Sequence, residues 1–93
     1  MRFFDRTVAV ITGATGGIGG ASAKLFAREG AKLVLGYRSG TDKAKAISKS
    51  CEELGAETLS LHVDVTDQED TRRFIAECHK AFGRIDCLVA VHG

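Results

Sequence analysis

Residues 8–20 read Val-Ala-Val-Ile-Thr-Gly-Ala-Thr-Gly-Gly-Ile-Gly-Gly, an apolar and mostly β-branched run that stops at a cluster of glycines. Apolar side chains then recur at helical spacing at Ile18, Ala21, Leu25 and Phe26. Glycines permit positive φ angles and close backbone approach, while the first turn of a helix presents free N–H groups and a positive dipole end. The stretch therefore predicts a strand, a turn able to hold phosphate groups, and a helix.

The alternation of strand and helix continues along the chain. Strands are expected over residues 7–12, 32–36, 57–63 and 85–91. Helices are expected over residues 17–29, after a cap at Thr41 or Asp42 up to residue 54, and after the capping-box spacing of 66–69 up to residue 82. A glycine follows each expected helix, at Gly30, Gly55 and Gly83. The chain contains no proline, repeat or linker, so residues 1–93 are expected to form one unit.

Each expected helix carries an apolar stripe, which we expect to face the sheet. The stripes are Ile18, Ala21, Leu25 and Phe26 in the first helix, Ala44, Ile47, Cys51 and Leu54 in the second, and Phe74, Ile75, Cys78 and Phe82 in the third.

This element order is typical of the α/β class. Right-handed crossovers between parallel strands predict a Rossmann-type doubly wound parallel sheet, here its N-terminal half (βαβαβαβ) with strand order 3-2-1-4. Ligands of such sheets bind beyond the carboxyl ends of the strands, where the strand order reverses. The segments expected to meet there are residues 13–19, 37–38, 64–65 and 92–93.

The composition is that of an ordinary globular protein, with 44% hydrophobic and 27% charged residues. A net charge of +1 gives no electrostatic reason to expect nucleic acid or a membrane as a partner, and no apolar run approaches the roughly 20 residues of a membrane span. Three cysteines without Cys-x-x-Cys spacing indicate reduced thiols and a cytoplasmic location. No metal spacing links the three histidines, which are expected in surface or packing roles.

Three segments resemble the N-terminal part of the short-chain dehydrogenase/reductase family, in its "classical" branch. They are Thr12-Gly13-x-x-x-Gly17-Ile18-Gly19, Asp64-Val65-Thr66-Asp67 and Phe82-Gly83-Arg84-Ile85-Asp86-x-Leu88-Val89. The resemblance extends over all 93 residues and includes the 3-oxoacyl-carrier-protein reductases. It implies a Rossmann-fold oxidoreductase that reduces a carbonyl or oxidises an alcohol with a nicotinamide dinucleotide.

The resemblance also implies which residues contact the cofactor. The residues implied to hold the pyrophosphate are Gly13, Thr15, Gly16, Gly17, Ile18 and Gly19. Asp64 would accept a hydrogen bond from the adenine amino group, and Val65 would contact the same ring. Gly93 matches the glycine that closes the family's Asn-Asn-Ala-Gly segment, which reads Ala-Val-His-Gly at residues 90–93 of this chain.

The residues after the second strand bear on the choice of cofactor. An acidic residue there would accept hydrogen bonds from the adenosine ribose and repel a 2′-phosphate. This chain has Tyr37, Arg38 and Ser39 instead. Because a guanidinium beside a hydroxyl suits a phosphate dianion, these residues favour NADP(H) over NAD(H).

Two other nucleotide-binding classes share parts of the glycine pattern. The spacing Gly13-x-x-Gly16-x-x-Gly19 also fits extended relatives that act on nucleotide sugars, whereas residues 82–89 favour the first branch. A P-loop NTPase is excluded because no Gly-Lys pair follows the glycines.

No catalytic residue is expected within this chain. The family's catalytic serine, Tyr-x-x-x-Lys pair and supporting asparagine follow the matched part, and Tyr37, the only tyrosine, has Thr41 four residues later. We expect a truncated cofactor-binding half-domain, which meets a carbonyl or alcohol substrate only if the chain continues. The alternative is a non-catalytic dinucleotide-binding or self-associating module. A homo-oligomer is expected because the fourth strand would expose an apolar edge.

Overall fold

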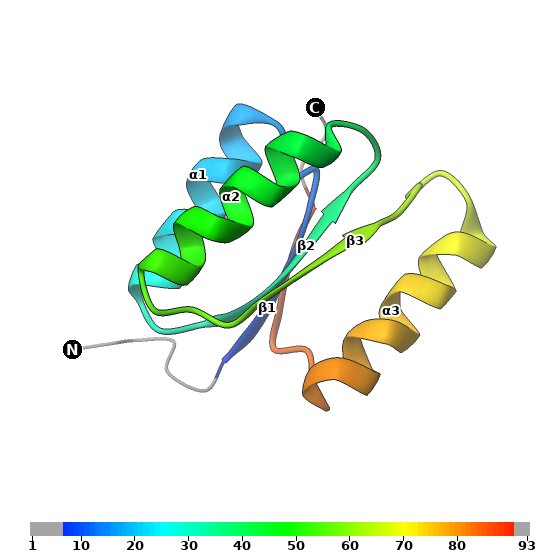
Figure 1. Ribbon diagram of the computed structural model, residues 1–93. Helices are drawn as coiled ribbons and strands as arrows, with labels where there is room; N and C mark the ends of the chain where they lie inside the picture. Colours follow the sequence, from blue (N-terminus) through cyan, green and yellow to red (C-terminus); the bar gives the residue numbers. More distant parts are fainter. Residues whose placement is uncertain (1–6, 91–93) are drawn as a thin grey trace.

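The computed structural model describes residues 7–90 (Figure 1). Four strands alternate with three helices in the predicted order. The elements are β1 (Val8–Thr12), α1 (Gly17–Arg28), β2 (Lys32–Tyr37), α2 (Thr41–Glu53), β3 (Thr58–His62), α3 (Gln68–Phe82) and β4 (Cys87–Ala90). β3 and β4 are shorter than predicted, and residue 91, the predicted end of the last strand, lies outside the described residues.

The strands form one sheet with the order β3-β2-β1-β4. All three strand pairings are parallel. Figure 1 shows α1 and α2 side by side over one face of the sheet and α3 over the other. The prediction of a Rossmann-type doubly wound α/β sheet with order 3-2-1-4 is therefore confirmed.

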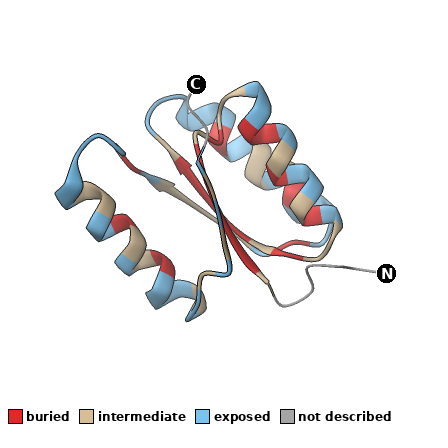
Figure 2. Cartoon of the chain, turned by 180° about the vertical axis from the view of Figure 1, so that it is seen from behind, coloured by how far each residue is buried: buried red, intermediate tan, exposed pale blue. Residues whose placement is uncertain are grey.

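The core lies on both faces of β1, in which all five residues are buried (Figure 2). Ala9 and Ile11 belong to the cluster beneath α1 and α2, whereas Val10 belongs to the cluster beneath α3. Side chains of a strand alternate between the two faces of a sheet, so a strand covered on both faces is apolar throughout. This accounts for the continuous apolar run with which the chain begins its fold.

The prediction for the buried face of α1 is wrong. Ile18 is 72% exposed, Leu25 is 58% exposed, and Ala21 is also exposed, while Phe26 is half-buried. The buried residues of α1 are Gly19, Gly20, Ala23 and Ala27. Ala23 and Ala27 belong to the cluster at the sheet, whereas Gly20 faces Ile47 of α2. Because these four residues are so small, the helix packs close to its neighbours and turns its larger apolar residues outward.

The stripes predicted for the other two helices agree better with the structure. Ala44 and Cys51 of α2 are buried, although Leu54, just after the helix, is 38% exposed. In α3, Phe74 and Cys78 are buried, and Ile75 and Phe82 pack against them. Burial raises the pKa of the Cys51 and Cys78 thiols.

Two helix starts differ from prediction. The N-cap of α2 is Gly40, with a left-handed φ of 78° and no side-chain cap, so Thr41 is already the first helical residue. The N-cap of α3 is Asp67, whose carboxylate accepts from the backbone N–H groups of Glu69 and Asp70, in place of the predicted capping box. A carboxylate satisfies first-turn donors and also favours the positive end of the helix dipole.

The three helix ends follow the prediction. Gly30, Gly55 and Gly83 have φ angles of 91°, 95° and 77°. Only glycine adopts this conformation readily, so these positions stop the helices where the sequence indicates.

Asp86 anchors β4 to β1. Its Oδ2 accepts the N–H of Val8 at 2.8 Å, and its own N–H donates to the Val8 carbonyl at 2.9 Å. The Arg84 guanidinium and the Val8 N–H both bind the carboxylate and hold the pKa of Asp86 below its usual value. The ionised form of Asp86 therefore stabilises the pairing of β1 with β4.

This arrangement predicts a specific acid sensitivity. A depressed carboxyl pKa contributes stability that is present above the unfolded value of 3.8 and is lost as the pH falls through the lower folded value. In Asp86→Asn we expect the free energy of unfolding, measured with urea from about pH 5 to about pH 2, to fall less steeply than in the wild type. Glu53→Gln removes a charge from the exposed end of α2 and is the control; an unchanged slope in Asp86→Asn would contradict the assignment.

Candidate functional site

The carboxyl ends of β1, β2 and β3 bring the predicted site residues to one edge of the sheet. The glycine loop of residues 13–19 follows β1, Arg38 follows β2, and Asp64 stands two residues after β3. Since the three strands are parallel neighbours, their carboxyl ends lie together. The contacts below join these segments directly.

The glycine loop folds tightly onto the first turn of α1. Gly13 has a φ of 69°, and its carbonyl accepts the N–H of Gly16 at 3.1 Å. A Cβ placed on Gly19 would lie 2.2 Å from the Gly13 carbonyl oxygen, so no side chain fits there. The backbone of the loop at Gly13 therefore lies directly against the backbone of the helix at Gly19.

The start of α1 fits a pyrophosphate. Its N-cap, Gly16, makes no side-chain cap hydrogen bond, and its first turn holds no acidic residue. The first N–H groups of a helix have no acceptor within the helix, and they lie at the positive end of its dipole. A Cβ on Gly17 would have no atom within 4 Å, so the space beside this first helical residue is open.

Two contacts join the glycine loop to the end of β2 and to the start of α2. The N–H of Ala14 donates to the Gly36 carbonyl at 3.1 Å. A Cβ on Gly40 would lie 3.4 Å from Cγ2 of Thr15, so Thr15 rests against the start of α2. The loop is therefore held beside Arg38 and Ser39, which lie between these two glycines in the sequence.

Arg38 and Asp64 face one another across the ends of β2 and β3. The Arg38 Nη2 lies 4.0 Å from the Asp64 Oδ2, with the two side chains 71% and 32% exposed. Exposed ion pairs at this distance are weak because water screens the two charges. The Arg38 guanidinium is consequently available to a second anion.

The other carboxylate oxygen of Asp64 is held by Thr66. It accepts the Thr66 N–H at 3.0 Å and the Thr66 hydroxyl at 2.6 Å. These hydrogen bonds, more than the nearby Arg38, hold the pKa of Asp64 below its usual value. Asp64 is therefore an ionised acceptor with a fixed orientation at the site.

Tyr37 contacts His62, a pairing that the sequence did not predict. Their rings meet edge to face with centroids 5.9 Å apart, and the two residues are register partners at the ends of β2 and β3. The contact gives His62 a packing role, as expected for the histidines, and holds Tyr37 against the end of β3.

The remaining predicted site residues are either exposed or outside the described residues. Gly17, Ile18, Ser39 and Val65 are exposed beside the site, with Ile18 at 72% and Val65 at 49%. Side chains exposed in this way are accessible to a ligand. Gly93 lies outside the described residues.

Sequence reasoning missed two residues that support Asp64 from α3. The N–H of Asp64 donates to Asp70 Oδ2 at 2.7 Å, and the Asp70 carboxylate in turn binds Arg73. A carboxylate and a guanidinium three residues apart on a helix form a recognisable surface pair. Their attachment to the end of β3 depends on the tertiary structure and left no signal in the sequence.

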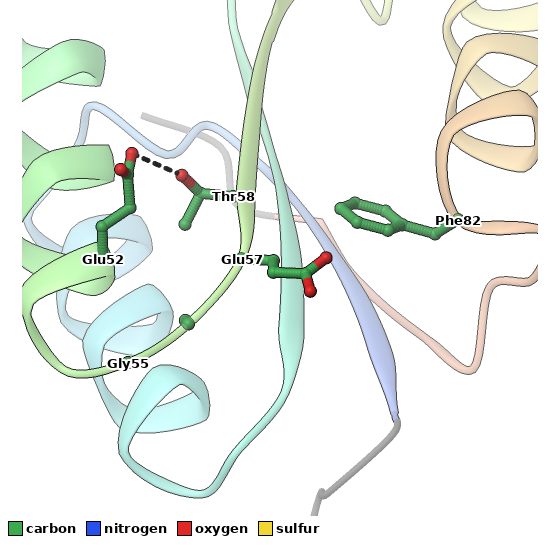
Figure 3. A pocket seen from close by; sticks show the side chains of 6 residues that line it. Glu52, Gly55, Glu57, Thr58 and Phe82 are labelled. Atoms are coloured by element: carbon green, nitrogen blue, oxygen red, sulfur yellow. Dashed lines mark hydrogen bonds between the residues drawn. The ribbon is translucent and has the colours of Figure 1, made fainter.

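A separate depression lies at the opposite end of β3 (Figure 3). It measures about 520 Å³ and is lined by residues that include Glu52, Glu57, Thr58 and Phe82. Thr58 donates to the Glu52 carboxylate at 3.1 Å across its rim. Because Thr58 is the first residue of β3, this depression is remote from the carboxyl edge.

Among residues 7–90, no group of three or more His, Cys, Asp or Glu side chains could hold a metal ion. Over the same range, none of the helices is long and apolar enough to cross a membrane.

Residues 7–93 match the family described as short chain dehydrogenase. L-rhamnose 1-dehydrogenase (NAD(P)(+)) of Azotobacter vinelandii is 37% identical over 93 residues, which cover 96% of this chain and 36% of that protein. The chain thus spans about a third of the length of such relatives.

Solved structures give the same result. A short-chain dehydrogenase/reductase from Serratia marcescens superposes with a TM-score of 0.92 at 29% identity, covering 97% of this chain and 37% of that one. NAD+-bound xylitol dehydrogenase superposes with a TM-score of 0.88 at 32% identity, covering 92% of this chain and 33% of that one.

Proposed function

Since the chain belongs to the short-chain dehydrogenase family, we propose that it is the cofactor-binding part of an NADP(H)-dependent oxidoreductase. The single observation that carries the proposal is the arrangement at the carboxyl edge, where the uncapped start of α1 lies beside the Arg38 and Asp64 pair. A positive helix end and a guanidinium are both suited to the phosphates of a dinucleotide.

The pyrophosphate and the adenine of the dinucleotide would each contact a different set of residues. The glycine loop would hold the pyrophosphate through the first N–H groups of α1, and Ile18 would cover it. Asp64 would accept a hydrogen bond from the adenine amino group through Oδ2, because Oδ1 is already occupied by Thr66. Exposed Val65 would contact the adenine face. When bound, the dinucleotide supplies or accepts the hydride.

The preference for the 2′-phosphate rests on the residues after β2. A carboxylate at this place would select the unphosphorylated ribose. This chain instead has a cation and a hydroxyl there, in the sequence Tyr37, Arg38 and Ser39. The Arg38 guanidinium is 71% exposed, so a phosphate can reach it. One structural neighbour was solved with NAD+ and one relative is named for both cofactors, so a measurement on this chain is needed.

Replacing Arg38 with alanine tests this preference. We expect the Kd for NADPH to rise about tenfold or more and the Kd for NADH to change less than about twofold, because only NADPH carries the phosphate that the guanidinium binds. Both titrations follow reduced-nicotinamide fluorescence on the same sample. Arg28→Ala, at the last turn of α1, is the matched control.

Equal rises in the Kd values for NADPH and NADH in Arg38→Ala would argue against a preference for NADP(H). The proposal of a dinucleotide-binding site would then still stand. Absence of binding by the wild-type chain would argue against the function itself.

The reaction would be reduction of a carbonyl or oxidation of an alcohol, in the whole protein. Tyr37 is not its acid, since it lies at the adenosine side against His62. In such a reaction a proton moves to or from the substrate oxygen while the hydride moves to or from carbon. A cytoplasmic location belongs to the same proposal.

A non-catalytic dinucleotide-binding module that self-associates is the second candidate. It is favoured by β4, the outer strand of the described sheet, in which Leu88 is 55% exposed. An open strand edge flanked by an apolar side chain can pair with a second copy. Cofactor binding with a concentration-dependent mass and no turnover would favour this homo-oligomeric module, whereas carbonyl reduction by the chain would contradict it.

A further inference from the structure

β3 is an outer strand of the described sheet, so one row of its backbone groups has no strand beside it. The N–H of Val63 points inward, donating to the Tyr37 carbonyl of β2 at 2.8 Å. Successive residues of an extended chain point their backbone groups to opposite sides. The carbonyl of His62 and the N–H of Asp64 therefore belong to the outward row.

Two side chains of α3 satisfy these outward groups. Arg73 donates through Nη2 to the His62 carbonyl at 2.7 Å, and Asp70 accepts the Asp64 N–H through Oδ2 at 2.7 Å. Arg73 and Asp70 are joined to each other, with Nε 2.9 Å from Oδ1. One donor and one acceptor thus stand beside β3 in the positions that a neighbouring strand would supply.

The pair is itself held on α3. Arg73 also donates through Nη1 to Glu77 at 3.1 Å, one helical turn further along. The hydrogen bond from the Asp64 N–H, followed by that from Arg73, holds the pKa of Asp70 below its usual value. Bonds to charged groups are stronger than neutral ones, so this pair resists the fraying expected at a strand end.

We infer that Asp70 and Arg73 are positioning residues that fix Asp64 for recognition of the adenine amino group. The inference rests on the proposed function. Thr66 holds one oxygen of the Asp64 carboxylate, and Asp70 holds the backbone from which that carboxylate projects. Oδ2 of Asp64, the oxygen that faces Arg38, is thereby left in a defined place for a ligand.

The test measures discrimination between two ligands that differ only at the purine. ADP-ribose carries the adenine amino group, and its hypoxanthine analogue carries an oxygen there. The ratio of their two Kd values, measured by calorimetry on the full chain, reports the contact at Asp64. A general loss of stability lowers both affinities together and leaves the ratio unchanged.

We expect the wild type to prefer ADP-ribose about tenfold, as a hydrogen bond to a charged group allows. In Asp70→Ala and Arg73→Ala that preference falls to about twofold or less, because the end of β3 loses its outer partner. Asp70→Asn keeps an acceptor oxygen and gives an intermediate ratio. Glu77→Gln, which touches Arg73 but not β3, keeps the wild-type ratio.

The outcomes separate the two proposals. If the wild type binds neither ligand, the proposed function fails and the inference fails with it. If the wild type binds ADP-ribose and prefers it, but Asp70→Asn and Arg73→Ala keep the full preference, only the inference is overturned. Equal binding of both ligands by the wild type overturns the inference as well, because Asp64 then does not recognise the amino group.

Discussion

Replacing Gly19 with alanine is expected to lower the free energy of unfolding by about 3 kcal/mol or more, the upper range for overpacking a tight contact. The added Cβ would lie 2.2 Å from the Gly13 carbonyl oxygen and 2.9 Å from the Ala14 Cα. Both atoms belong to the backbone, so no side chain can rotate away. Either the glycine loop or the first turn of α1 must move. Urea denaturation followed by circular dichroism measures the loss.

The matched control is Gly17→Ala, two residues earlier in the same helix. A Cβ at Gly17 would have no atom within 4 Å, and the residue is exposed. We expect this variant to be as stable as the wild type or more stable by up to about 1 kcal/mol, since alanine restricts the unfolded chain. A Gly19→Ala variant as stable as Gly17→Ala would contradict the close contact between loop and helix.

Replacing Phe74 with alanine is expected to cost about 3–5 kcal/mol, as for large buried aromatic side chains. Phe74 is 1% exposed and is the largest fully buried side chain of the described residues. It packs in the cluster that joins α3 to the sheet, next to Val63 and Cys78. Because a chain of this size has a total stability of only about 5–14 kcal/mol, a large fraction of the variant should unfold or lose the docking of α3.

Urea denaturation again provides the measurement, with Ile75→Ala as the control. Ile75 neighbours Phe74 on α3 but is only partly buried, so its truncation should cost about 1 kcal/mol. Equal losses in the two variants would mean that α3 is not held chiefly by Phe74.

The order of elements could be predicted because each segment carries a local signal of its own. The apolar run of β1 indicates a strand buried on both faces, and the glycines at 30, 55 and 83 end helices through backbone sterics, so both signals are visible in the sequence. The buried face of α1 could not be predicted in the same way. Its contact with the sheet depends on small size rather than apolar character, so Leu25 was assigned to a core that Ala23 and Ala27 occupy.

Some residues of the candidate site could also be predicted from the sequence, and others could not. Residues that follow strand ends, such as Arg38 and Asp64, can be placed from the strand order alone, and the structure brings these two together. Of the two residues that orient Asp64, Thr66 acts through a local turn two residues along the chain. Asp70 acts through a hydrogen bond whose geometry depends on how α3 docks. The choice of NADP(H) and the individual cofactor contacts remain predictions, since they concern a ligand rather than the fold.

The position of β1 in the sheet constrains the order in which the chain can fold. β1 pairs with β2, 24 residues later in register, and with β4, whose Cys87 is the partner of Ala9. During synthesis β2 and β3 can assemble on β1 while its other edge stays unpaired until β4 leaves the ribosome. Closing so long a loop is slow compared with local pairing, and an unpaired edge is prone to intermolecular contacts. The addition of β4 is therefore a step at which a nascent chain needs protection from its neighbours.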